Sequence, residues 1–298
     1  MQGEKQKTVQ ADLLLLLVAL IWGFGFVAQR AGMEHVGPYT YNGIRFLLGG
    51  LCLLPLTFST HRDGRADMVP GLSPLKAGLP AGIILFAGAS LQQVGLLYTT
   101  AGKAGFITGL YVIFVPVLGL LLGQRTGIGT WIGALLATAG MYLLSVQADF
   151  SINRGDLLVL LGAVFWAVHV LLLGYLSPRT CPVRLAMIQF LLCGLFSLLV
   201  ALAIESTTVQ AIADAAVPIL YGGVCSVGIG YTLQVVAQRR AHPAHAAILL
   251  SLEAVFAAVG GWWLLAEVFS VRGLTGCGLM LGGMLLSQLY PLLQTKEP

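Results

Sequence analysis

The side chains best suited to chemistry in this 298-residue chain are polar groups set inside long apolar runs. Glu253 lies near the middle of the apolar run 243–265, and Tyr111 occupies the corresponding place in the earlier run 102–123. A carboxyl group in apolar surroundings is costly unless it is protonated or meets a partner. We expect Glu253 either to carry a proton or hold an ammonium group, or to bond a neighbouring helix as a structural carboxylate. Tyr111 is expected to face the same cavity.

Two tryptophans lie ten residues inside their apolar runs, deeper than the aromatic belt at a membrane interface. In a helix Trp22 shares a face with Gly25 and Gln29, and Trp166 shares the equivalent face with His169. Their rings suit stacking on a flat or apolar part of a ligand, with ordinary packing as the alternative. His169 could carry protons or be a buried histidine bonded to a neighbour.

Two glutamines, Gln92 and Gln234, occupy corresponding positions in the two halves and are accompanied on the same two helices by Tyr98 and Tyr231. Amide and hydroxyl groups can bind an amino or carboxyl group without burying a charge. The alternative is hydrogen bonding between helices. Because both copies keep the amide, we expect these four side chains to contact a ligand.

The elements that position these residues are membrane-spanning helices. Hydrophobic residues make up 57% of the chain and charged residues 9%, and the mean hydropathy is +0.89, which excludes a soluble protein. A helix needs about 20 apolar residues to span a bilayer. Ten such spans are expected, at 11–31, 39–59, 74–98, 102–123, 127–146, 155–176, 183–204, 215–237, 243–265 and 271–292.

The positive charges predict the orientation of these spans. With the N-terminus inside, 11 Lys and Arg residues fall on the inner side and 4 on the outer side, which predicts that both termini are cytoplasmic. Arg45 lies within the second span. It could bind a substrate carboxylate, but we expect it to snorkel to the outer interface or to pair with helix C-terminal carbonyls.

The chain contains an internal repeat. Residues 11–22 match 155–166 at 7 of 12 positions, and residues 44–51 match 188–195 at 6 of 8, with the same offset in both cases. Each copy would hold five spans, an odd number, so the second copy must be inverted in the membrane. We therefore expect an all-α membrane protein of two inverted five-helix repeats, 1–148 and 149–298. Transporters with such repeats bind substrate near the midplane, between the halves.

Three segments resemble the EamA family of the drug/metabolite transporter superfamily, which includes YddG-like amino-acid exporters. They are the entrance DLLLLLVALIW at 12–22, IRFLLGGL at 44–51, and 252–267, which runs from LEAVF through GGW to LAE. The resemblance covers essentially the whole chain and implies a ten-helix carrier that commonly exports small metabolites. The chain departs from the family pattern at Ala254, where proline is frequent, so the resemblance gives no proline-based reason to expect a helix break there.

The sequence predicts a secondary transporter rather than an enzyme. It lacks a P-loop, a zinc-protease motif and a nucleophile elbow, so transport is expected to be gradient-driven or facilitated, without a cofactor or metal. We expect an exporter of amino acids or related metabolites, working by alternating access. The expected substrate-binding residues are Trp22, Gln92, Tyr98, Tyr111, Trp166, His169, Tyr231, Gln234 and Glu253.

The alternatives are an exporter of nucleobases, drugs or sugar derivatives, a membrane enzyme using Glu253 and His169, and a non-catalytic assembly protein, which the short loops disfavour. Expected partners are a small-molecule substrate and membrane lipid. The net charge of +4 is dispersed between apolar runs and does not indicate nucleic acid. A monomer or weak homodimer in the cell (inner) membrane is expected.

Overall fold

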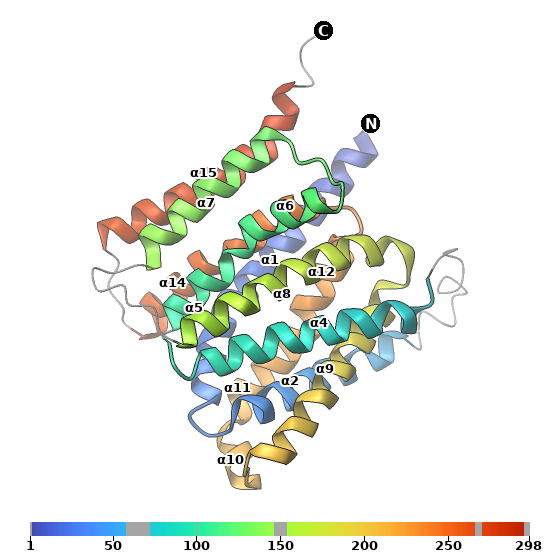
Figure 1. Cartoon of the computed structure of the whole chain (residues 1–298), viewed down its shortest axis with the longest axis vertical. Coiled ribbons are helices and arrows are strands. Elements are labelled where there is room, and N and C mark those ends of the chain that lie inside the picture. Colours follow the sequence, from blue (N-terminus) through green and yellow to red (C-terminus); the bar gives the residue numbers. More distant parts are fainter. Residues whose placement is uncertain (1, 58–71, 100, 146–153, 266–269, 295–298) are drawn as a thin grey trace.

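The computed structural model describes residues 2–57, 72–99, 101–145, 154–265 and 270–294, and every regular element in these ranges is a helix (Figure 1). The first half contains α1 (Gln2–Gly32), α2 (Pro38–Cys52), α4 (Pro74–Gly95), α5 (Ala101–Gly109), α6 (Tyr111–Leu121) and α7 (Ile128–Ser145). The second half contains α8 (Arg154–Leu176), the 3-10 turn η1 (Ser177–Arg179), α9 (Pro182–Ile204), α10 (Val209–Asp214), α11 (Ala216–Leu220), the π-helix η2 (Tyr221–Tyr231), α12 (Thr232–Ala237), α13 (Pro243–Ser251), α14 (Glu253–Leu265) and α15 (Val271–Gln294).

The expected all-α membrane fold is confirmed. Within the described residues, six helical segments are long and apolar enough to cross a bilayer, at 8–32, 74–95, 104–121, 154–179, 182–204 and 216–237. Shorter apolar helices cover 128–140, 243–257 and 271–287. The expected span 39–59 is interrupted, because α2 ends at Cys52.

Four of these helices begin with proline. Pro38, Pro74, Pro182 and Pro243 start α2, α4, α9 and α13. The first N–H of a helix has no intrahelical acceptor, so proline loses nothing there, and its restricted φ already suits the helix. Local sequence chemistry therefore determines where these helices begin.

Two spans are broken at equivalent positions. Leu110 separates α5 from α6, and Leu252, its counterpart in the second half, separates α13 from α14. Each leucine N–H bonds a carbonyl three residues back, with N···O distances of 3.2 Å, instead of the α-helical carbonyl four residues back. The break at Leu252 forms although position 254 is alanine, so proline is not its cause.

Helices of the two halves pack in pairs. α7 lies along α15 at one end of the molecule, and α2 lies along α9 toward the other, with α4 beside α8 between them (Figure 1). Glycine permits the closest approach: a Cβ added to Gly133 of α7 would lie 2.7 Å from the Gly283 carbonyl oxygen of α15. These pairs join the fifth expected span to the tenth and the second to the seventh, so equivalent helices of the two halves lie side by side.

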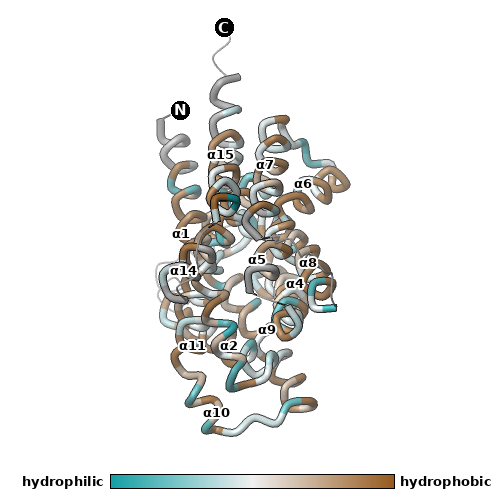
Figure 2. Tube along the Cα trace, turned by 90° about the vertical axis from the view of Figure 1, so that its left-hand side faces the viewer, coloured by the Kyte–Doolittle hydropathy of each residue, from teal (hydrophilic) through white to brown (hydrophobic). Residues whose placement is uncertain are grey.

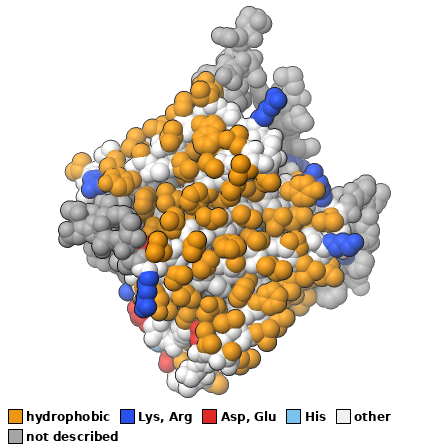
Figure 3. Space-filling model, viewed as in Figure 1, with side chains coloured by type: hydrophobic (Ala, Val, Ile, Leu, Met, Phe, Trp, Pro, Cys, Tyr) orange, Lys and Arg blue, Asp and Glu red, His pale blue; other side chains and the backbone are white. Residues whose placement is uncertain are grey.

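The outer surface is apolar. Hydrophobic residues dominate the trace of the helices (Figure 2), and hydrophobic side chains cover the face in Figure 3, where Lys and Arg lie near its edges. Large apolar side chains such as Leu202, which is 83% exposed, would be costly in water and suit lipid. The predicted orientation depends partly on Arg62, Arg65 and Lys296, which lie outside the described residues, as does Glu267 of the LAE segment.

Candidate functional site

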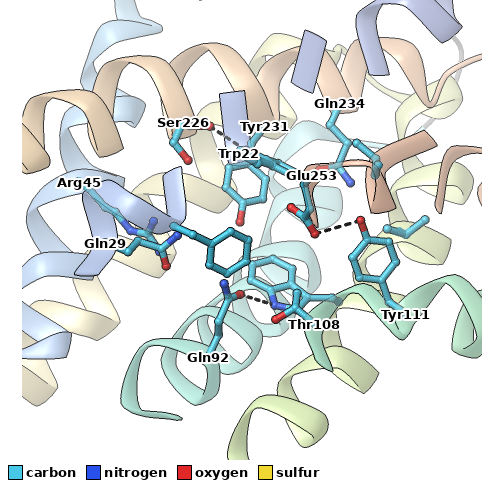
Figure 4. Close-up of a pocket in the computed structure, with 14 residues that line it drawn as sticks. Trp22, Gln29, Arg45, Gln92, Thr108, Tyr111, Ser226, Tyr231, Gln234 and Glu253 are labelled. Carbon is cyan, nitrogen blue, oxygen red and sulfur yellow. Dashed lines mark hydrogen bonds between the residues drawn. The ribbon is translucent and has the colours of Figure 1, made fainter. Parts of the chain in front are cut away.

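A cavity lies in the middle of the bundle, where helices of both halves meet, with about 510 Å³ of empty space counting its mouth (Figure 4). Of the nine side chains predicted to bind substrate, seven line it: Trp22, Gln92, Tyr111, Trp166, Tyr231, Gln234 and Glu253. The wall also includes Phe26, Gln29, Arg45, Thr108, Val170, Ser226 and Leu250. Only about 40 Å³ of it has room for water-sized molecules, less than the volume of a typical small-ligand site, so a substrate requires the site to widen.

The two Trp–Gln pairs in the wall are repeat-related but bonded differently. Trp166 Nε1 donates a hydrogen bond to Gln92 Oε1 at 2.7 Å. In the other half, Trp22 Nε1 donates instead to the backbone carbonyl of Ser226 in η2, at 3.2 Å. Gln234 Oε1, the equivalent of the Gln92 acceptor, is buried without a hydrogen-bond partner. The sequence symmetry is therefore not matched by symmetry of hydrogen bonding.

Tyr231 is the centre of an aromatic cluster. Its ring centroid lies 4.5 Å from that of Trp22, 6.0 Å from that of Trp166 and 5.9 Å from that of Phe46. These separations are typical of stabilising aromatic pairs. The cluster joins α1, α2, α8 and η2 through aromatic contacts.

Tyr111 and Glu253 contact each other directly. The Tyr111 hydroxyl donates to Glu253 Oε1 at 3.2 Å, although the two residues belong to different halves. Both are buried, and each directly follows one of the helix breaks, Leu110 or Leu252. Equivalent residues of two repeats can touch only near the axis that relates them, so this bond marks the middle of the site.

Arg45 lies in the cavity wall, and this corrects the expectation that it snorkels to the interface. It is 4% exposed, and its Nε donates to Asn42 Oδ1 at 3.0 Å. Its guanidinium carbon lies 5.3 Å from the Tyr41 ring centroid and 4.9 Å from that of Phe46. These contacts on its own helix hold the side chain inside the bundle, and no local sequence pattern reveals them.

Tyr98, which was expected to contact a ligand together with Gln92, does not line the cavity. α4 ends at Gly95, and Tyr98 lies in the turn that follows. Its ring is 41% exposed and stacks under the Arg154 guanidinium, whose carbon is 3.8 Å from the ring centroid. The apolar run continues past the end of the helix, so hydropathy alone places Tyr98 too deep.

His169 lies behind the cavity wall. It is fully buried and hydrogen-bonded through Nε2 to Gln189 Oε1 at 2.9 Å, with its ring edge-on to Trp166 at 6.1 Å. It therefore supports the wall instead of lining it. Of its two predicted roles, this geometry favours a buried histidine bonded to a neighbour.

Other polar groups tie the ends of the bundle. Asp12 at the start of the first span contacts His245 Nε2 at 3.1 Å, and its repeat equivalent Asp156 accepts a bond from Thr99 at 2.5 Å.

In the part of the chain that the structure describes, no three His, Cys, Asp or Glu side chains group so as to hold a metal ion. The cysteines are free.

The chain is similar to known transporters. The profile of the EamA-like transporter family matches residues 9–146 and, a second time, residues 153–289. An uncharacterized transporter of Archaeoglobus fulgidus is 32% identical over 292 residues, which cover 96% of this chain and 88% of that protein. The uncharacterized inner membrane transporter YedA of Escherichia coli K12 is 28% identical over 172 residues, which cover 57% of this chain and 54% of YedA.

A protein of known crystal structure has the same fold. It superposes with a TM-score of 0.78 and covers 94% of this chain and 96% of its own, at 19% sequence identity. At that identity the likeness concerns the fold alone. The family matches, which extend over most of both halves, and the helical membrane fold lead to one conclusion. This protein belongs to the EamA-like transporter family and is a multi-pass membrane transporter.

Proposed function

We propose that this protein is a secondary carrier that exports amino acids or related small metabolites by alternating access. In this proposal it lies in the cell (inner) membrane with both termini on the cytoplasmic side, and 1–148 and 149–298 are the moving halves. The observation that carries the proposal is a central cavity walled by paired Trp and Gln residues from both halves. A site at the junction of two halves can face either side when the halves rock.

The two ends of the cavity differ. Gln29 and Arg45 line the cavity toward the end of the bundle where α1 ends and α2 begins. Their equivalents in the second half, Leu173 and Gln189, are fully buried and do not line it, and His169 bonds Gln189. These polar side chains of the first half therefore line the cavity without counterparts from the second, and this asymmetry suits one state of an alternating-access cycle.

In this proposal the change between states is an exchange of hydrogen bonds between the two Trp–Gln pairs. In this state Trp166 bonds Gln92, while Trp22 bonds the Ser226 carbonyl and Gln234 Oε1 lacks a donor. In the opposite state Trp22 would donate to Gln234, and Trp166 would release Gln92. The exchange keeps one Trp–Gln hydrogen bond in each state, so the two states can have similar free energies.

The chemistry of the wall favours an organic cation or zwitterion. The Glu253 carboxylate suits an ammonium group, and the faces of Trp22 and Trp166 attract both cationic and flat groups. Exporters of nucleobases or drugs would use similar aromatic walls. A membrane enzyme is not favoured, because His169 lies behind the wall and bonds Gln189, so it and Glu253 do not act on one site.

Counterflow in proteoliposomes tests this function with a panel of amino acids, nucleobases and quaternary amines. We expect exchange of labelled amino acids by the wild-type protein and its loss in Trp166→Ala, whose ring lines the cavity. Arg154→Gln, a change on the exposed surface, is the matched control. Exchange of nucleobases alone would favour the second substrate class. No exchange of any compound would overturn the carrier function.

A further inference from the structure

Arg45 is a buried cation whose hydrogen-bonding capacity is largely unused. It is 4% exposed and lines the central cavity. Of its five N–H donors, the one on Nε meets Asn42 Oδ1. Among the described residues, no acceptor bonds the four N–H groups at the tip of the guanidinium. These N–H groups therefore remain accessible from the cavity.

The positive charge also lacks a counter-charge. Arginine stays protonated at any physiological pH, so burial cannot neutralise it. The rings of Tyr41 and Phe46 offer weak attraction only. Glu253 lines the same cavity but bonds Tyr111, and no ion pair between Arg45 and a carboxylate occurs within the described residues. In Figure 4 Arg45 lies at one side of the group of lining residues, and Glu253 lies nearer its middle.

The other half of the chain provides an internal comparison. The equivalent of Arg45 is Gln189, a neutral amide that is fully buried and hydrogen-bonded to His169. A membrane helix of this type therefore packs without a cation at this position. The charge occurs in the half where the position faces the cavity, which argues for a ligand rather than for packing.

We infer that Arg45 binds a carboxylate of the transported compound. The inference rests on the proposed carrier function, because it assigns a group on the substrate. The planar guanidinium presents paired N–H donors that match the two oxygens of a carboxylate, so one contact supplies both charge and orientation. A compound with a carboxylate at Arg45 and a cationic group toward Glu253 would pair with both of these side chains.

The test compares compounds that differ in the carboxylate alone. Affinity is measured from ligand-dependent shifts in the thermal unfolding midpoint of the purified protein in detergent. The probes are the amino acids of the panel, 4-methylpentanoate, and the corresponding amides, in which the carboxylate is neutral. We expect the wild-type protein to bind acids about tenfold or more tightly than their amides, as for loss of a charge-assisted hydrogen bond.

The variants assign that preference to Arg45. Arg45→Gln, which installs the residue of the other half, should remove the preference for acids. Arg45→Lys, which keeps the charge but loses the paired donors, should retain part of it. Arg154→Gln, an exposed arginine outside the cavity, should bind as the wild type does. If Arg45→Gln does not fold, the comparison of acids with amides in the wild type and in Arg45→Lys still tests whether Arg45 binds the carboxylate.

Three results would overturn the inference: equal binding of acid and amide, an unchanged preference in Arg45→Gln, or no binding of any carboxylate in the panel. Failure of the carrier function is a separate result. Counterflow of amines or amides that is unaffected by Arg45→Gln would leave the carrier function intact and remove the role of Arg45. Absence of any flux would remove the carrier function itself.

Discussion

Replacing Trp166 by Phe tests whether the Trp–Gln pairs hold the conformational state of this transporter. Phenylalanine keeps an aromatic ring in the wall but lacks the N–H that donates to Gln92 Oε1 at 2.7 Å. The Gln92 acceptor would then be buried without a partner in the present state. In the proposed opposite state Trp166 has already released Gln92, so the substitution costs nothing further there. We therefore expect Trp166→Phe to shift the population toward the opposite state.

The size of the shift follows from the hydrogen bond. Leaving a buried acceptor unsatisfied costs about 1–3 kcal/mol, which is a 5- to 150-fold change in the ratio of the two states. Trp22→Phe is the matched control, because the same atoms are removed at the equivalent position. It loses a longer bond, 3.2 Å, to a backbone carbonyl, and in the opposite state it would leave Gln234 unpaired. Its shift should therefore have the opposite sign.

Distances between spin labels at the two ends of the bundle measure this shift by double electron–electron resonance. Labels at His35 and Arg154 report the end where α1 meets α2, and labels at Arg179 and Arg239 report the other end; all four positions are exposed. Trp166→Phe should shorten the first distance and lengthen the second, and any change in Trp22→Phe should have the opposite sign. Shifts of the same sign in both variants, or none in either, would refute the exchange of hydrogen bonds.

Three further predictions concern single positions. Gly230→Ala should lower the unfolding midpoint and transport, because the added Cβ would lie 2.7 Å from Trp22 Nε1. Gly88→Ala is the control and should have a mild effect, because its Cβ would lie 3.4 Å from the nearest atoms. Equal unfolding midpoints in the two variants would contradict this prediction. Glu253→Gln keeps an acceptor for the tyrosine hydroxyl but loses the charge, so counterflow of amino acids should fall about tenfold or more while the midpoint changes little. Tyr98→Ala should leave counterflow unchanged, because that ring lies outside the cavity, and a loss comparable to that of Glu253→Gln would be inconsistent with its position.

The fold was largely predictable from hydropathy, but the helix breaks were not. A bilayer demands long apolar segments, and these are visible as composition. The breaks at Leu110 and Leu252 carry no such mark, because leucine favours helices. Proline is no guide either: Pro80 and Pro116 lie inside helices that continue through them. Residue type therefore does not reveal where these spans break.

The site was predictable where the two copies agree. Trp22 with Trp166, and Gln92 with Gln234, were identified by identity at equivalent positions, and all four line the cavity. Arg45 differs from its equivalent and was expected at the interface. The depth of a long side chain depends on its neighbours in space, so one helix alone does not predict it.

The differences between the two copies bear on how transport is directed. Trp and Gln are the same in both halves, so their bonds can exchange between states at little net cost. Arg45 and Gln189 cannot exchange, because one is charged and the other is neutral and bonded to His169. A ligand shifts a conformational equilibrium only by its difference in affinity for the two states. If the opposite state withdraws Arg45 from the cavity, as Gln189 is withdrawn here, that state binds carboxylates more weakly and would favour their release.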